Sequence, residues 1–307
     1  MKINTNISSL TAQEAAKNTN NSIANSLEKL STGLKINKAS DDASGLAIAD
    51  KLRTQVTSIN QGVANGNSAI ALLQITDKSM AEQSKILDTI KSKLIQANTD
   101  TTSTAGRTAI AKDITKLLQQ LNNIGEQTNY NGTTLLQKAR TTADASTEGN
   151  LTAARTAKGG LSFQIGEGTA DLITTRTINS NVAGLKLTAL AKAVRTGAKA
   201  SAGATAGTAS VFSRAMASAG QKAIDKAITK LNGYRGDIGS TQNQVESAVR
   251  NLMTQSTNIK NAESVIRDVD YAEESANFNK LNIISQAGSY AISQSNAVSQ
   301  NVLRLLQ

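Results

Sequence analysis

The chain has 307 residues, of which 39% are hydrophobic and 2% aromatic, and its formal net charge is +10. It contains no Pro, Cys or His, which excludes disulfides, thiolate zinc sites, His-ligated metals and catalytic triads that need His. We therefore predict a protein that is not an enzyme and has no cofactor or metal. The absence of Pro favours long uninterrupted helices, because an interior Pro costs about 3 kcal/mol.

The first residues, MKINTNISSL, lack the apolar core of a secretory signal peptide, and no run of 18 apolar residues occurs anywhere. The Lys and Arg residues are scattered and have no interleaved aromatics for base stacking. We therefore expect neither a membrane span nor a nucleic-acid partner.

Residues 1–34 carry apolar side chains near both ends and a polar stretch between them. The apolar positions are Ile3, Ile7, Leu10, Ile23, Leu27, Leu30 and Leu34. A helix with so broken a stripe needs a partner for stability. The following connector contains Gly33 and Gly45 as breakers, and Ser40, Asp41 and Asp42 as candidate N-caps. We interpret the two carboxylates as caps or connector ion pairs rather than as ion ligands.

A heptad pattern over residues 49–94 predicts a long helix. Its steps of three and four run through Ala49, Leu52, Val56, Ile59, Val63, Gly66, Ile70, Leu73, Asp77, Met80, Ser84, Leu87, Lys91 and Leu94. The stripe weakens at Asp77, Ser84 and Lys91, while Leu72, Ile75, Ile86 and Ile90 add apolar surface on a neighbouring face. This pattern indicates more than one packing partner, and we expect the helix to end near Asn98.

A second helix is predicted over residues 107–127, folding back on the first, and Tyr130-Asn131-Gly132 then makes a turn. Residues 161–180 contain an alternating segment, a Gly-containing loop and a β-prone run, which predict a β-hairpin. Residues 191–210 have too little apolar bulk for a core of their own, so we expect a loop or a short helix on the surface.

The heptad returns over residues 224–266, and a last helix follows Asp268-Val269-Asp270. The stripe of this last helix is Leu281, Ile284, Gly288, Ala291, Ser295, Val298, Val302 and Leu305. Its Gly, Ala and Ser members permit close approach of another helix. The predicted fold is mostly α, a long antiparallel helical bundle or coiled-coil rod with a small β-hairpin region at its outer end.

The terminal helices bury little area, so we expect them to be marginal in a monomer and stable when packed against further copies of the chain. A contact repeated by a rotation that does not close produces a filament. The candidate assembly residues are Ile7, Leu10, Leu27, Leu30, Leu34, Leu281, Ile284, Gly288, Ala291, Val298, Val302 and Leu305.

Several motifs resemble bacterial flagellin in order and spacing. They are INTN at 3–6, LSTGLKINKASDDASGLAIADKLR at 30–53, NYNGTTLL at 129–136, RGDIGSTQNQVESAVRNL at 235–252, ESVIRDVDYAEESANF at 263–278, and the C-terminal IISQAGSYAISQSNAVSQNVLRLLQ. The resemblance covers about 1–137 and 220–307.

The resemblance implies an extracellular filament subunit for motility, exported through the flagellar type III apparatus without a cleaved signal peptide. Implied partners are further copies of the chain, an export chaperone, the filament cap and junction proteins. Residues 1–45 and 268–307 are then the inner coiled-coil domain, 46–137 and 211–267 the helical rod domain with hairpin 161–180, and 138–210 an outer segment without a large separate domain. The alternatives are a hook–filament junction protein, or a surface adhesin using the basic middle segment.

Three further expectations depend on this resemblance. From Lys138 to Lys222 there are eleven basic and four acidic residues, which leads to the hypothesis of a positively charged filament surface. The stretch with Leu87, Thr89, Lys91, Ser92 and Leu94 is similar to the Campylobacter-type variant, so we expect weak or no recognition by the vertebrate flagellin receptor. The candidates for O-glycosylation are Thr174, Thr175, Ser180, Thr196, Ser201, Thr205 and Ser210.

Overall fold

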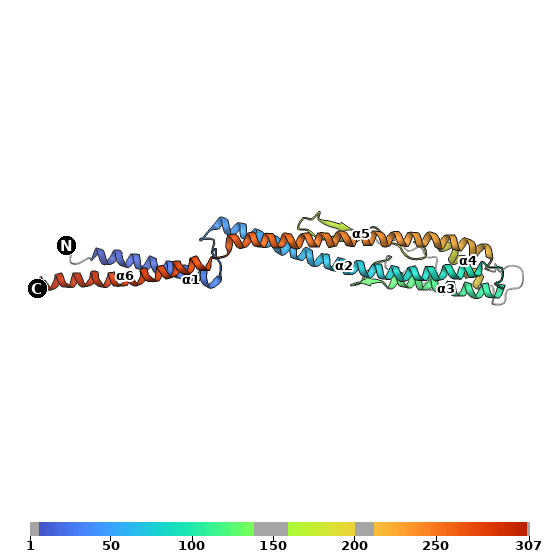
Figure 1. The fold of residues 1–307 in the computed structure, drawn as a ribbon, viewed down its shortest axis with the longest axis horizontal. Coiled ribbons are helices and arrows are strands. Elements are labelled where there is room, and N and C mark those ends of the chain that lie inside the picture. Colours follow the sequence, from blue (N-terminus) through green and yellow to red (C-terminus); the bar gives the residue numbers. More distant parts are fainter. Residues whose placement is uncertain (1–5, 138–158, 200–211, 306–307) are drawn as a thin grey trace. The chain divides into compact units, whose positions relative to one another are not determined.

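The structure is a computed structural model that describes residues 6–137, 159–199 and 212–305. Six helices dominate these ranges (Figure 1): α1 (Ile7–Thr32), α2 (Ala43–Ala97), α3 (Thr104–Gln127), α4 (Thr188–Lys199), α5 (Arg214–Arg267) and α6 (Tyr271–Leu305). Two small antiparallel sheets pair β1 (Asn129–Tyr130) with β2 (Thr133–Thr134), and β3 (Ser162–Gln164) with β4 (Leu172–Thr174). The prediction of a mostly α fold with a small β-hairpin is confirmed.

The chain forms two compact units, residues 1–58 with 254–307, and residues 59–253. Helices α2 and α5 contribute residues to both. No helix in the described ranges combines the length and the apolar character needed to cross a membrane.

In the first unit, α1 and α6 lie side by side and run antiparallel (Figure 1). The helix ends carry caps that the sequence specifies. The Asn6 side chain accepts a hydrogen bond from the Ser9 amide at the start of α1, and Gly33 ends that helix in the left-handed conformation at φ 74°. The Asp270 side chain accepts from the amides of Ala272 and Glu273 at the start of α6.

In the second unit, one face of α2 packs against several elements. Its buried positions step by three and four residues through Ile59, Gly62, Gly66, Ala69, Leu73, Thr76, Met80, Gln83, Leu87, Ile90, Leu94 and Ala97. Every second residue of this buried line, beginning with Ile59, is a position of the heptad predicted from the sequence. The residues between them each precede a predicted heptad position by one, as Thr76 precedes Asp77. The predicted positions Asp77 and Lys91 are instead ion-paired with Arg235 and Asp225 of α5.

The contacts of α2 explain why its buried line differs from the predicted heptad. Helix α3 lies beside α2, since Lys93 pairs with Asp113 and the Gln83 side chain donates to the Leu121 carbonyl. Because α5 approaches from another direction, the most buried line of α2 falls between two partners.

Glycines on α2 permit two close approaches. A methyl group at Gly62 would overlap the carbonyl oxygen of Ile165, next to β3, and one at Gly66 would overlap Val249 of α5. The side chain of Asn65 donates to the Gln164 carbonyl, so the β3–β4 hairpin is attached to the same stretch of helix. Gly62 and Gly66 are therefore required for packing in this unit.

The hairpins follow the predicted turn chemistry. Asn131 and Gly132, between β1 and β2, have φ values of 48° and 77°, which is the type I′ pattern that favours Asn-Gly. In the second hairpin, Phe163 pairs with Ile173 across β3 and β4.

Helix α4 differs in part from expectation. A short helix was one predicted alternative, but we expected it on the surface, whereas Leu190, Ala191 and Val194 are buried. Their spacing places them on one face of the helix, which packs against α3. The segment before it is also buried, through Ile178, Val182, Leu185 and Leu187.

Candidate assembly surface

Small and polar residues make up much of the contact between α1 and α6. On α1 the least exposed positions follow a heptad through Ser9, Ala12, Ala16, Thr19, Ile23, Ser26 and Leu30. On α6 they follow Glu274, Phe278, Leu281, Ser285, Gly288, Ile292 and Ser295. Hydrogen bonds cross the seam from Asn6 to Ser295, from Ser285 to Asn20 and from Ser26 to Glu274. This seam buries few large side chains, so most of the large apolar residues of the two helices whose side chains the structure describes lie on other faces.

The large apolar residues outside the seam are exposed. Relative exposure is 63% for Ile7, 54% for Leu10 and 54% for Leu27 on α1. On α6 the exposed residues are Tyr271, Ile283, Ile284, Tyr290 and Val298. Since Ile284, Ala291 and Val298 recur every seven residues, they form one exposed stripe of α6, and Ile283 and Tyr290 lie on a second.

The predicted assembly residues therefore separate into two groups. Leu30, Leu281 and Gly288 lie in the α1–α6 seam, and Leu34 is half-buried where it bridges to Asp268. The exposed group contains Ile7, Leu10, Leu27, Ile284, Ala291 and Val298. Val302 and Leu305 belong to α6, but their side chains lie outside the described part. The sequence analysis did not identify Ser9, Ser26, Glu274 or Tyr290. Ser9, Ser26 and Glu274 lie in the seam, and the heptad spacing of small and polar residues could have revealed them.

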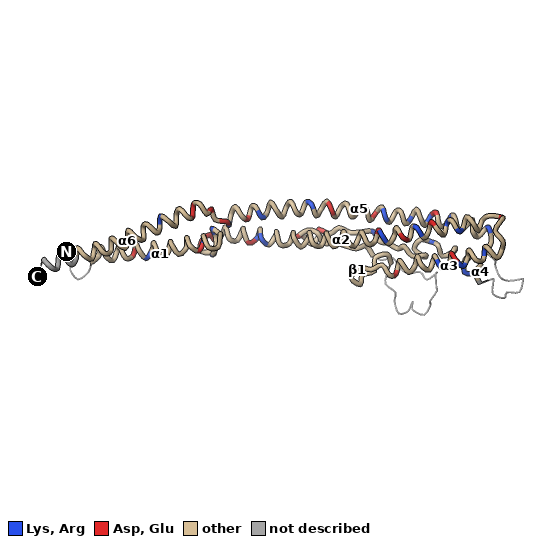
Figure 2. Tube along the Cα trace, turned by 60° about the horizontal axis from the view of Figure 1, so that its bottom comes forward, with Lys and Arg blue, Asp and Glu red and all other residues tan. Residues whose placement is uncertain are grey.

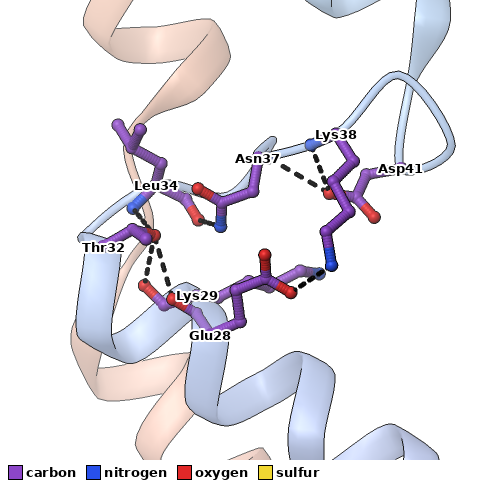
Figure 3. Close-up of polar contacts among 7 residues, drawn as sticks. All are labelled: Glu28, Lys29, Thr32, Leu34, Asn37, Lys38 and Asp41. Atoms are coloured by element: carbon purple, nitrogen blue, oxygen red, sulfur yellow. Dashed lines mark hydrogen bonds and ion pairs between the residues drawn. The ribbon is translucent and has the colours of Figure 1, made fainter.

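The connector between α1 and α2 is held by polar contacts (Figure 3). The Asp41 carboxylate accepts hydrogen bonds from the amides of Asn37 and Lys38, and the Lys38 ammonium pairs with Glu28 at 2.6 Å. Asp42 caps α2 by accepting from the Gly45 amide. Asp41 and Asp42 both act within the connector, as the sequence predicted. The described residues contain no group of three side chains that could hold a metal ion.

Backbone hydrogen bonds join this connector to the α5–α6 junction. The Lys35 amide donates to the Arg267 carbonyl, and the Val269 amide donates to the Gly33 carbonyl. Leu34 and Asp268 form an antiparallel bridge between them. The break between α1 and α2 and the break between α5 and α6 therefore lie together in the first unit. Their contacts fix where the α1–α6 pair begins.

Acid is expected to release the connector. The two amides that donate to the carboxylate hold the pKa of Asp41 below its usual 3.8. Because the folded pKa is lowered, the stabilisation is complete above pH 3.8 and is lost as pH falls through the folded pKa. A carbon-13 NMR titration of the Asp41 carboxyl should give a midpoint below 3.8, and the amide shifts of Asn37 and Lys38 should follow it. A midpoint at or above 3.8, or an unchanged amide titration in Asp41→Asn, would contradict this assignment.

The residues of the receptor-region prediction alternate between core and surface. Leu87 and Leu94 are fully buried, Thr89 and Ser92 are exposed, and the half-buried Lys91 pairs with Asp225. On the folded chain, Thr89 and Ser92 are therefore accessible to a binding protein, whereas Leu87 and Leu94 are not. Weak recognition stays a prediction.

The glycosylation candidates differ in accessibility. Thr174 and Thr196 are exposed, whereas Ser180 is fully buried and Thr175 is 9% exposed, with its hydroxyl in contact with Leu161. The folded chain therefore offers Thr174 and Thr196 to a modifying enzyme, but not Ser180 or Thr175. Ser201, Thr205 and Ser210 lie outside the described residues.

Comparison with known proteins matches both ends of the chain. Residues 3–141 match the bacterial flagellin N-terminal helical region, and residues 221–306 match the bacterial flagellin C-terminal helical region. Flagellin of Bacillus subtilis is 33% identical over 316 aligned residues, covering 100% of both chains. The flagellar filament 33 kDa core protein of Treponema phagedenis is 32% identical, again over 100% of both chains. Among solved structures, a candidate flagellar hook-associated protein of Vibrio parahaemolyticus shares the fold, with a TM-score of 0.56 and 12% identity over 74% of this chain and 99% of that one.

Proposed function

Because the chain belongs to the bacterial flagellin family and is a structural subunit of the flagellar filament, we propose that its exposed α1 and α6 stripes are the surfaces that bind further copies. The observation that carries the proposal is the separation of apolar residues on these helices. The α1–α6 seam is made largely of small and polar residues, while Ile7, Leu10 and Ile284 remain exposed.

Burial of these exposed apolar side chains between subunits would favour assembly. Full burial of a large aliphatic side chain contributes about 1.5–3 kcal/mol relative to leaving it exposed. Several such residues on each subunit, repeated along a polymer, supply a strong driving force for association. Since two α6 stripes point in different directions, one subunit can contact more than one neighbour, as a helical polymer requires.

Substitution on α6 is expected to block polymerisation without unfolding the monomer. Ile284→Asn/Val298→Asn removes two apolar side chains that the monomer leaves exposed at 43% and 49%. If both are buried in the filament, the loss of about 3 kcal/mol raises the critical concentration roughly a hundredfold. Sedimentation and electron microscopy after salt-induced assembly measure this.

A matched variant controls for helix propensity. Gln286→Asn/Gln294→Asn introduces the same residue at two exposed polar positions of α6, and we expect it to polymerise like the parent chain. Filaments of Ile284→Asn/Val298→Asn at the parent's critical concentration would refute the proposal. Far-UV circular dichroism tests whether each monomer remains folded.

We also propose where the segments of the chain lie in the polymer. We assign residues 1–45 and 268–307 to the interior of the polymer, which the pairing of α1 with α6 supports, and the hairpin-containing segment to its outside. An export chaperone, the filament cap and junction proteins are proposed partners through the family resemblance. The full-length flagellin relatives favour a filament subunit over a junction protein or a dedicated adhesin.

A further inference from the structure

Nearly all of the excess positive charge is concentrated in part of the second unit. Residues 85–116, 186–198 and 212–230 contain thirteen Lys and Arg but only four Asp and no Glu, an excess of nine in a chain of net charge +10. Figure 2 shows Lys and Arg gathered along α3, α4 and the adjoining parts of α2 and α5.

These three segments are neighbours in the folded unit. Lys93 of α2 pairs with Asp113 of α3, and Arg214 at the start of α5 pairs with Asp100 between α2 and α3. Helix α4 packs on α3, and its Leu190 lies where a side chain at Gly220 of α5 would be. The charge excess therefore belongs to one region of the folded unit, where the three segments meet, and is not spread evenly along the sequence.

Some of the thirteen cations have partners within the unit. Lys85, Lys91, Lys93 and Arg214 form ion pairs, while Arg107 and Lys230 donate to backbone carbonyls. The other seven have no acidic partner among the described residues. This basic surface consists of Lys112, Lys116, Lys186, Lys192, Arg195, Lys222 and Lys226, all of them exposed except the half-buried Arg195.

The arrangement of five of these residues is unfavourable for the isolated chain. Lys112 and Lys116 are four residues apart on α3, Lys222 and Lys226 are four apart on α5, and like charges at this spacing repel. Lys186 also adopts φ 60°, a backbone conformation that Gly or Asn would occupy at less cost. The packing of the unit does not depend on the six Lys charges, because these side chains are exposed.

The chemistry of the surrounding surface selects among polyanions. The only aromatic residue in the three segments is Phe212, which is fully buried, so the surface has no platform on which bases could stack. Ile95 is the one large apolar side chain exposed there among the described residues, which is too little for insertion into a lipid surface. Six of the seven cations are Lys, which act as point charges without the bidentate geometry of Arg.

We propose that the basic surface binds a linear acidic polysaccharide, one carrying uronate or sulfate groups, on the outside of the folded chain. Successive Lys residues on α3 and on α5 are spaced about 6 Å along each helix axis, which suits a polymer with regularly repeated charges. Binding to the unassembled chain does not depend on the filament contacts proposed above.

The test is binding of polygalacturonate and heparin to the full-length monomer over a range of salt concentrations. Lys112→Gln/Lys116→Gln/Lys222→Gln/Lys226→Gln should lower the affinity at least about tenfold and reduce the slope of log affinity against log salt by about four. The control Lys17→Gln/Lys51→Gln/Lys260→Gln/Lys280→Gln removes the same net charge from exposed positions of the first unit and should bind like the parent.

Binding by the two variants and by the other polyanions can support or overturn the proposal. Loss confined to the variant of the basic surface, with helicity retained by circular dichroism, supports it. Equal loss in the control would show that net charge alone is responsible. Tighter binding to a single-stranded oligonucleotide or to phosphatidylglycerol vesicles than to either polysaccharide would also overturn it.

Discussion

Gly62→Ala is expected to lower the free energy of unfolding of the second unit by about 2 kcal/mol. The added methyl group would overlap the Ile165 carbonyl oxygen, and that oxygen belongs to backbone that cannot move without shifting the β3–β4 hairpin. The gain in helix propensity from replacing Gly offsets only part of this cost. Urea denaturation followed by circular dichroism measures the change, and hydrogen exchange at the Ile165 and Thr175 amides should report displacement of the hairpin.

Gly236→Ala is the matched control for this substitution. Gly236 lies inside α5, and a methyl group built there meets nothing within 4 Å. The same chemical change should therefore stabilise the monomer by about 0.5–1 kcal/mol. If both variants were stabilised alike, the close approach of the hairpin to α2 would be disproved.

Gln83→Leu is expected to destabilise the second unit by a similar amount, about 2 kcal/mol. Gln83 is completely buried on α2, and its side-chain amide donates to the carbonyls of Leu121 and Ser180. Leucine fills nearly the same volume but leaves both interactions unmade. The effect should appear as a lower urea midpoint with an unchanged denaturant slope.

The change should also be local to the segment before α4. The Ser180 carbonyl is held by Gln83 and the Ser180 amide donates to the Leu136 carbonyl, so hydrogen exchange near Ser180 should accelerate in the variant. Gln120→Leu makes the same replacement at an exposed position of α3 and should change the stability by less than about 0.5 kcal/mol. Equal destabilisation by both variants would contradict the role given to Gln83.

The periodicity of the sequence predicted the helices well but placed only half of the buried line on α2. The column Ile59, Gly66, Leu73, Met80, Leu87 and Leu94 is correct, because every position except Gly66 carries a large apolar residue. The other column is Gly62, Ala69, Thr76, Gln83, Ile90 and Ala97, in which all residues except Ile90 are small or polar and give little hydrophobic signal. A search for apolar residues cannot find a face whose burial depends on glycine and a hydrogen-bonded glutamine.

The same limitation applies to the α1–α6 pair. Sequence reasoning grouped Ile284, Ala291 and Val298 with Leu281 and Gly288, whereas the structure places the first three outside the seam. Hydrophobicity identifies residues that must be buried somewhere, but it does not distinguish burial within a chain from burial between chains. The connector contacts of Asp41 and Asp42 were predictable, because capping residues act on amides close to them in sequence.

The pairing of α1 with α6 also determines the order in which the chain can fold. Asn6 contacts Ser295 across 289 positions of sequence, and Ser26 contacts Glu274 across 248. Contacts between such distant residues form slowly, and α1 alone has too few large residues in its seam to remain helical. In a chain that emerges amino terminus first, α1 therefore waits without its partner until the 35 residues of α6 have appeared. Closure of the first unit therefore requires that α6 has been delivered.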